Sequence, residues 1–186
     1  KNNTSSFNSQ VKIYKDKFFA IDFENVLKCY SLKDGTEIWS RKTDQSFIKS
    51  QKKLSLIVIN DVVYFNNSLG DISAVDIKSG DLLWQLPTQK STIYEAAFSL
   101  ETSDIIADEN NLFFSNNNNQ FFSIDLLTGT INWMQEFSSE LRPAVIGDYL
   151  VTISDDGLLI VMNKQSGQII RINDLLKSIK KKKKKN

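Results

Sequence analysis

AVDIKSGDLLW, residues 74–84, is the segment that decides the fold, because its pattern occurs four times along the chain. In its complete form, a small residue is followed by a short acid, a polar turn and a glycine, and a tryptophan comes four residues after the glycine; the spacing is kept in all four copies, although two of them lack part of the pattern. Successive glycines lie 45, 49 and 38 residues apart, at Gly35, Gly80, Gly129 and Gly167. A period of this length is typical of propeller blades and similar arrays.

Each copy of the pattern ends a series of four short apolar runs separated by polar turns. In the second copy the runs are Leu54–Ile59, Val62–Phe65, Ile72–Ile77 and Asp81–Leu86, and Asn60-Asp61 forms the first turn. Runs this short and rich in Val, Ile, Leu and Phe indicate strands buried on both faces rather than helices. Four such units predict an all-β fold, a β-propeller with four-stranded antiparallel blades.

The third turn of each unit has the sharpest local chemistry. Asp76 and Asp125 begin two of these turns, where a short acid can accept hydrogen bonds from the turn's own backbone N–H groups. Gly80 and Gly129 end them, where glycine permits the positive φ of a hairpin closed by a bulge. The tryptophan then lies on the outer strand, placed to contact a neighbouring turn.

These segments resemble the tryptophan-docking motif of pyrroloquinoline-quinone (PQQ)-type propellers. The copies ending at Trp84 and Trp133 match fully, the copy ending at Trp39 lacks the acid, and the copy ending at Arg171 lacks both acid and tryptophan. The resemblance covers nearly all of residues 11–172. It implies that the three tryptophans hold neighbouring blades together rather than stack on a quinone.

The domain organisation follows from the repeat. Blades are expected at about residues 11–41, 54–86, 104–137 and 143–172, with a short helix or turn starting at Asn173, so that the propeller spans 1–178. PQQ-type propellers usually have seven or eight blades, so the resemblance implies the C-terminal half of such a ring, with further blades before Lys1. Residues 179–186 are expected to be a disordered Lys-rich tail; contact of Lys180–Lys185 with anionic lipid headgroups is the alternative.

Composition excludes several classes of function. The net charge is +1, which offers no large basic face for nucleic acid, and no apolar run is long enough to span a membrane. The chain has no histidine, and its single cysteine, Cys29, occupies a slot filled elsewhere by Ala, Ser or Val, so we expect it to be buried. The metal site that we keep as an alternative is a calcium site formed by five acids that cluster in the sequence, Glu95, Glu101, Asp104, Asp108 and Glu109. These acids lack the tight alternating spacing of a loop that binds calcium through oxygen ligands.

Within the PQQ-type propellers, the chain most resembles the BamB family, the lipoprotein subunits of the outer-membrane β-barrel assembly machinery. The resemblance implies a non-enzymatic scaffold without a cofactor, held at the periplasmic face of the outer membrane by an N-terminal lipid that this sequence lacks. It also implies binding to the central barrel-inserting subunit, with unfolded barrel precursors as further candidate partners.

Two other functions stay open at this stage. A fragment of a PQQ-dependent quinoprotein dehydrogenase is one, although such enzymes typically carry adjacent cysteines and a carboxylate-bound calcium, and this chain has one cysteine. The sensor ectodomain of a membrane receptor is the other.

Candidate partner-binding residues lie in the connectors between blades, which share a rim with the second turns. Unlike the blades, these connectors vary in length, and they are Lys42–Lys53, Thr88–Asp104 and Gln135–Arg142. Variable loops on a rigid scaffold often bind partners. We therefore take Phe47, Tyr94 and Arg142 as candidate contacts, with ordinary loop packing as the alternative. Asn116–Asn119 falls at a second turn and is expected to be solvated loop.

Overall fold

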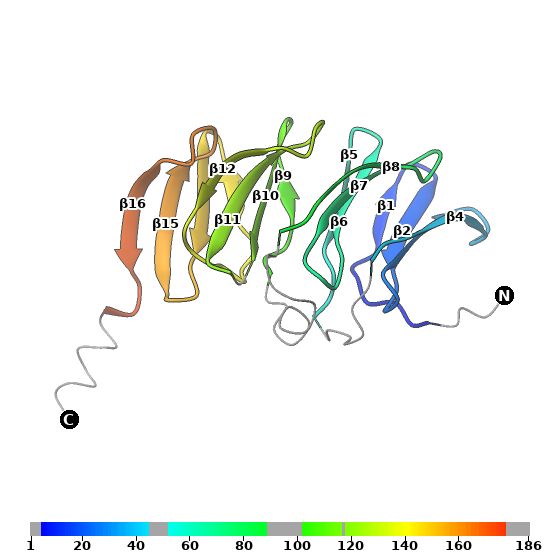
Figure 1. Ribbon diagram of the computed structural model, residues 1–186, viewed down its shortest axis with the longest axis horizontal. Helices are drawn as coiled ribbons and strands as arrows, with labels where there is room; N and C mark the ends of the chain where they lie inside the picture. Colours follow the sequence, from blue (N-terminus) through cyan, green and yellow to red (C-terminus); the bar gives the residue numbers. More distant parts are fainter. Residues whose placement is uncertain (1–4, 45–51, 89–101, 117, 178–186) are drawn as a thin grey trace, which may run out of the picture. The chain divides into compact units, whose positions relative to one another are not determined.

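The computed structural model describes residues 5–44, 52–88, 102–116 and 118–177, and their strands form four antiparallel four-stranded sheets (Figure 1). Within each sheet the strands lie side by side in sequence order. The expected all-β fold of repeated four-stranded units is therefore confirmed. The chain divides into two compact units, residues 1–101 and 102–186, each holding two sheets.

The first unit contains the first and second sheets. The first sheet consists of β1 (Lys12–Tyr14), β2 (Lys17–Ile21), β3 (Val26–Ser31) and β4 (Glu37–Lys42). The second consists of β5 (Leu56–Ile59), β6 (Val62–Asn66), β7 (Ile72–Asp76) and β8 (Leu82–Leu86).

The second unit contains the third and fourth sheets. The third consists of β9 (Ile106–Ala107), β10 (Asn111–Asn116), β11 (Gln120–Asp125) and β12 (Ile131–Gln135). The fourth consists of β13 (Ala144–Ile146), β14 (Tyr149–Ile153), β15 (Leu158–Asn163) and β16 (Ile169–Asp174).

The turns explain why the strands pair in this register. Asn60 and Asp61 both have positive φ, +50° and +62°, which is the type I′ geometry that suits a two-residue hairpin. Before each third turn the register shifts by a β-bulge beside the small residue of the repeat, as it does after Ala74 and after Ser123. The bulge and the positive φ of the turn glycine set the direction of the outer strand.

Each unit has a hydrophobic core between its two sheets. In the first unit Phe19 of β2 and Phe65 of β6 are fully buried in one cluster. In the second unit Phe113 of β10 and Phe121 of β11 are fully buried in another. Burying one such side chain contributes about 1.5–3 kcal/mol to folding, so these clusters hold the sheets together in pairs.

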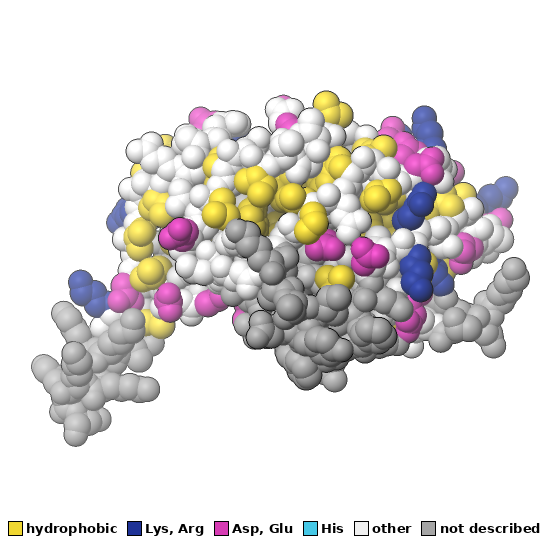
Figure 2. All heavy atoms as spheres, in the orientation of Figure 1, with side chains coloured by type: hydrophobic (Ala, Val, Ile, Leu, Met, Phe, Trp, Pro, Cys, Tyr) yellow, Lys and Arg dark blue, Asp and Glu magenta, His cyan; other side chains and the backbone are white. Residues whose placement is uncertain are grey.

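Burial on both faces, expected for all strands, is correct for the middle strands of the second and third sheets, whereas β14 of the fourth sheet exposes Tyr149 and the outer strands are exposed at several positions. Every residue of β10 is buried, whereas Leu83 on β8 and Met134 on β12 are exposed. The outer strands are less buried because each is the last strand of its sheet and has a neighbouring strand on one side only. Hydrophobic side chains are accordingly visible at the surface in Figure 2.

Two local expectations need correction. Asn116 is not solvated loop but the buried last residue of β10, where its Oδ1 accepts the backbone N–H of Asn118 at 3.0 Å. β16 continues to Asp174, so the turn that follows begins two residues later than expected. In the part of the chain that the structure describes, no helix is long and apolar enough to cross a membrane.

Candidate interaction rim

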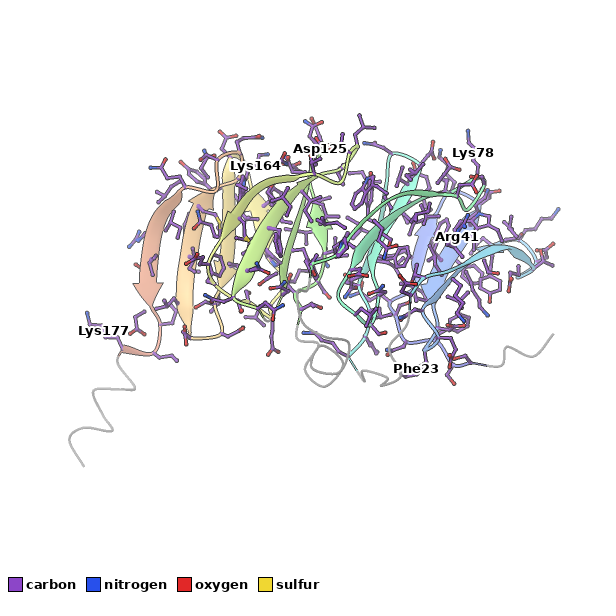
Figure 3. The ribbon with its side chains drawn as sticks, viewed as in Figure 1. Phe23, Arg41, Lys78, Asp125, Lys164 and Lys177 are labelled. Carbon is purple, nitrogen blue, oxygen red and sulfur yellow. The ribbon has the colours of Figure 1, made fainter. Side chains whose placement is uncertain are left out.

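The turns of each sheet lie at its two ends, and we call these two ends its edges; the second turns lie at one edge, and the first and third turns lie at the other. In Figure 3, Phe23 in the β2–β3 turn and Lys78 in the β7–β8 turn lie at opposite edges of the first unit. Because strands alternate in direction, the connectors that leave the outer strands lie at the edge of the second turns. We call this edge, formed by the second turns and the connectors, the connector rim.

At the edge opposite the connector rim, Trp39 of the first sheet contacts the third turn of the second sheet. Its indole Nε1 donates to the carbonyl oxygen of Ile77 at 3.0 Å. The ring covers Gly80 so closely that a Cβ there would lie 2.7 Å from the indole Cδ2. Arg41 adds a hydrogen bond from Nε to the Gly80 carbonyl at 2.7 Å and an ion pair with Asp81 at 3.1 Å.

The second unit repeats this contact. Trp133 of the third sheet donates from Nε1 to the carbonyl oxygen of Lys164 at 3.0 Å. Its ring covers Gly167, and Gln135 takes the place of Arg41 with a hydrogen bond from Nε2 to the Gly167 carbonyl at 2.9 Å. Figure 3 shows Lys164 in this turn, at the same edge of the unit as Asp125.

The remaining residues of the predicted docking motif occupy matching places. Trp84 lies beside Tyr64 of its own sheet, with ring centroids 5.8 Å apart. Gly129 has φ +72°, like the other turn glycines. Gly35 also has a positive φ, +70°, but no heavy atom of the described residues lies within 4 Å of its ideal Cβ position.

Asp76 and Asp125 organise their own turns. Oδ1 of Asp76 accepts the backbone N–H groups of Lys78 and Ser79, each at 2.8 Å. Oδ1 of Asp125 accepts the backbone N–H and the hydroxyl of Thr128, at 2.8 and 2.9 Å. These hydrogen bonds, the backbone N–H of Ser79 or Thr128 first, lower the pKa of each carboxyl below its usual range.

At the connector rim of the first unit, Asn25 joins the second turns of both sheets. Its side-chain amide donates to Ser68 Oγ at 2.7 Å and to the backbone carbonyl of Asp44 at 2.8 Å, and its Oδ1 accepts the N–H of Ser68 at 3.1 Å. Asn25 is buried and has φ +56°. One side chain thus fixes the start of the first connector against both turns.

Asp71 lies in the same rim and is partly buried. Its Oδ2 accepts hydrogen bonds from Gln85 Nε2 at 3.1 Å and from Asn67 Nδ2 at 3.4 Å. Burial nevertheless raises the pKa of the Asp71 carboxyl, because removal from water disfavours the charged form. Nearby, the buried Thr88 at the start of the second connector donates its hydroxyl to the Gly70 carbonyl at 2.7 Å.

In the second unit the whole connector Gln135–Arg142 is described, and both sheets hold it. The N–H of Ser139 donates to Ser115 Oγ in the third sheet at 2.9 Å, and Ser139 Oγ donates to the Ile153 carbonyl in the fourth at 2.8 Å. The N–H of Glu140 donates to Asp155 Oδ1 at 2.9 Å. This connector is therefore a fixed part of the rim.

Of the three predicted partner contacts, the structure describes one. Arg142 is exposed beside the exposed Leu141 at the end of the anchored connector. Phe47 and Tyr94 lie outside the described residues. Sequence reasoning missed the anchors Asn25 and Ser139; their only sequence signal is a polar residue beside a turn, and their partners lie in another sheet.

The described residues contain no group of three or more Cys, Asp or Glu side chains placed to hold a metal ion. Among the acids of the calcium alternative, Asp108 is already occupied: its carboxylate accepts the N–H of Asn111 at 2.8 Å and pairs with Lys164 at 3.2 Å. Cys29 is buried, which raises the pKa of its thiol to about 11. Charges of both signs are interspersed on the face drawn in Figure 2.

Comparison with known proteins agrees with this arrangement of sheets and turns. The family model described as "Outer membrane protein assembly factor BamB" matches residues 2–173. The chain belongs to the BamB family. A curated relative, outer membrane protein assembly factor BamB of Legionella pneumophila (strain Paris), is 25% identical over 173 residues. That match covers 87% of this chain but 42% of the relative, so the chain spans less than half of the relative's length.

Solved structures show the same fold. BamB from Moraxella catarrhalis superposes with a TM-score of 0.72 at 19% identity, covering 92% of this chain and 49% of that one. A europium-containing methanol dehydrogenase superposes with a TM-score of 0.69 at 14% identity, covering 91% of this chain and 42% of that one. The chain is thus a partial β-propeller of the PQQ type, and the resemblance to the BamB family is confirmed.

Proposed function

We propose that this chain is a non-enzymatic scaffold that supports assembly of β-barrel proteins at the periplasmic face of the outer membrane. Membership of the BamB family supports a role at the outer membrane, and one structural observation supports a role in binding a partner. The connector Gln135–Arg142 is held by hydrogen bonds from two sheets while Leu141 and Arg142 are exposed at its end. A fixed loop loses little conformational freedom on binding, which favours recognition of a partner.

The proposed partner is the central barrel-inserting subunit of the assembly machinery, with unfolded barrel precursors as a second class. Arginine is enriched at interface hot spots, and the planar guanidinium of Arg142 offers several hydrogen-bond donors beside the apolar side chain of Leu141. We propose peripheral attachment to the membrane through an N-terminal lipid carried by a longer form of the polypeptide.

The test is capture from the native envelope in mild detergent, followed by mass spectrometry. We expect recovery of a barrel-assembly core subunit, and we expect Arg142→Glu to reduce that recovery about tenfold or more, as loss of a hot-spot contact of about 1.4 kcal/mol would. Lys78→Glu, a charge reversal of an exposed residue in a third turn, is the matched control and should leave recovery unchanged. Equal recovery with both variants would refute the assignment of the rim.

The quinoprotein alternative rests on the fold shared with the methanol dehydrogenase. It predicts that PQQ added with calcium changes the absorbance of the protein in a saturable way. We expect no such change; a saturable one would contradict the non-enzymatic scaffold.

A further inference from the structure

Four buried hydroxyl groups form a hydrogen-bonded network in the second unit. They belong to Ser103, Ser115, Ser139 and Thr152, and each of these residues is between 0% and 4% exposed. Ser103 precedes the third sheet, Ser115 lies in β10, Ser139 lies in the connector Gln135–Arg142, and Thr152 lies in β14. The network, which we call the hydroxyl network, therefore runs from the third sheet through the connector to the fourth sheet.

The hydrogen bonds fix the direction of each hydroxyl. Ser103 Oγ accepts the backbone N–H of Ser115 at 2.9 Å, and Ser115 Oγ accepts the N–H of Ser139 at 2.9 Å. Ser139 Oγ lies 2.8 Å from the carbonyl oxygen of Ile153 and 2.8 Å from Thr152 Oγ1. A serine hydroxyl has a single proton. Because Ser139 donates that proton to the Ile153 carbonyl, Thr152 donates its own proton to Ser139.

The network reaches the exposed end of the connector. Ser139 Oγ lies 3.4 Å from the carbonyl oxygen of Leu141, which belongs to the peptide bond that joins Leu141 to Arg142. On the other side of Arg142, Pro143 is buried, and its ring fixes its own φ. The backbone of Arg142 is thus held from both directions along the chain, while its side chain is exposed.

The first unit fixes its connector in a different way. There, the side chain of Asn25 reaches from a second turn to the start of the first connector. Asn119 occupies the same position of the repeat in the third sheet, and it also has a positive φ, +58°. Its backbone N–H donates to Ser138 Oγ at 3.0 Å. In the second unit the connector therefore contributes its own hydroxyls, those of Ser138 and Ser139, to the contacts that hold it.

We propose that Ser139 is a positioning residue for Arg142, and that with Thr152 and Ser115 it holds the connector in the conformation that binds the protein partner. The inference rests on the proposed function of the connector rim, and it adds the groups on which affinity depends. The hydroxyls are buried and do not themselves touch a bound protein. They act because a connector that is ordered beforehand loses less conformational freedom on binding.

The first test measures amide hydrogen exchange in the full chain alone. Thr152→Val keeps the volume of the side chain and removes its hydroxyl, whereas Thr152→Ser keeps the hydroxyl and removes a methyl group. We expect exchange at the N–H groups of Ser139 and Glu140 to be about threefold to tenfold faster in Thr152→Val, the effect of losing one hydrogen bond. Thr152→Ser should exchange like the parent. Exchange that follows the urea midpoint of each variant, and not the presence of the hydroxyl, would overturn the proposal.

Ser123→Ala is the matched control for this measurement. Ser123 is 1% exposed in β11 of the same unit, and its Oγ accepts a hydrogen bond from Asn132 of its own sheet at 3.4 Å. This variant should leave exchange at Ser139 and Glu140 unchanged. If it accelerated exchange there as much as Thr152→Val does, loss of any buried hydroxyl would loosen the unit, and the positioning role would be wrong.

The second test is capture of the barrel-assembly core subunit from the native envelope. Thr152→Val should reduce its recovery about threefold or more, and Thr152→Ser should not. In a chain that also carries Arg142→Ala, Thr152→Val should reduce recovery less than it does in the parent, because both changes act on the same contact.

The outcomes separate this inference from the proposed function. Equal recovery by the parent and by Thr152→Val, or the same reduction with and without Arg142→Ala, would overturn the positioning role and leave the proposed function standing. A parent chain that recovers no core subunit would instead refute the proposed function. The exchange measurements would then still decide whether the hydroxyl network fixes the connector.

Discussion

Trp39 donates its indole N–H to the carbonyl oxygen of Ile77, 38 residues further along the chain, and so ties the first sheet to a turn of the second. Trp133 makes the equivalent bond to Lys164, 31 residues further on. The same geometry in two units indicates that the contact is a property of the repeat. Its energetic weight can be measured residue by residue.

Gly80→Ala should destabilise the protein more than the same change at an open glycine. The positive φ costs about 1–2 kcal/mol for an L-residue, and the clash with the Trp39 ring adds about 1–3 kcal/mol of overpacking. Gly147 also has a positive φ, but no described atom lies within 4 Å of its ideal Cβ. Urea denaturation should therefore rank Gly80→Ala below Gly147→Ala. Equal midpoints would mean that the indole gives way at little cost.

Trp133→Ala should lower the free energy of unfolding by about 3–5 kcal/mol, because it removes a ring packed against Phe113 and Phe121. Trp133→Phe keeps a ring but loses the hydrogen bond to Lys164, and should cost more than the roughly 0.5–1.5 kcal/mol of one hydrogen bond but less than alanine. Thermal and urea unfolding give the order. If alanine were as stable as the parent, the predicted structural role of the docking tryptophans would be wrong.

Asn25→Ala should loosen the connector rim of the first unit. It removes three hydrogen bonds to Ser68 and Asp44, each contributing about 0.5–1.5 kcal/mol. Asn25→Gly separates the loss of the side-chain hydrogen bonds from the cost of the positive φ, because glycine adopts a positive φ readily but makes no side-chain hydrogen bond. We expect both variants to be destabilised, alanine more than glycine, and we expect faster amide exchange at Ser68 in both. Unchanged amide exchange at Ser68 would show that the second turn of the second sheet is stable without the hydrogen bonds from Asn25.

Asp125→Asn should make the free energy of unfolding fall less steeply as the pH is lowered. Because hydrogen bonds from Thr128 lower the pKa of Asp125 in the folded state, its contribution is present above the unfolded pKa of about 3.9. It is lost as pH falls through the folded value. Asn163 makes the same turn bonds without a charge, so the Asp125→Asn variant should keep the turn. Its urea midpoints between pH 2 and pH 7 should fall less on acidification than those of the parent.

The sequence alone predicted the strands and the third turns, because both depend on local features. Alternation of apolar runs and turns placed β6 and β7 within one residue at each end. The positive φ of Gly80 followed from its place in a hairpin turn. Such features need only neighbours in the chain.

The candidate site was less predictable, because its anchors depend on residues far apart in sequence. Asn25 meets Ser68 across 43 positions, and Ser139 meets Ser115 across 24. The buried Asn116 was mistaken for solvated loop for the same reason, since an asparagine run shows its polarity but not what covers it. The exposure of the outer strands could not be predicted either, because such a prediction requires knowing which strand is the last one in each sheet.

Both tryptophan contacts run forward, from an outer strand to a turn synthesised later. When β4 leaves the ribosome, the acceptor of Trp39 has yet to be made, and β7 and its turn must follow before the indole has a partner. The first and third sheets therefore complete their tryptophan contacts only when the following sheet has been made. A premature stop directly after either of these sheets would leave its tryptophan without its hydrogen-bond acceptor, and quality-control machinery can recognise such an exposed aromatic side chain.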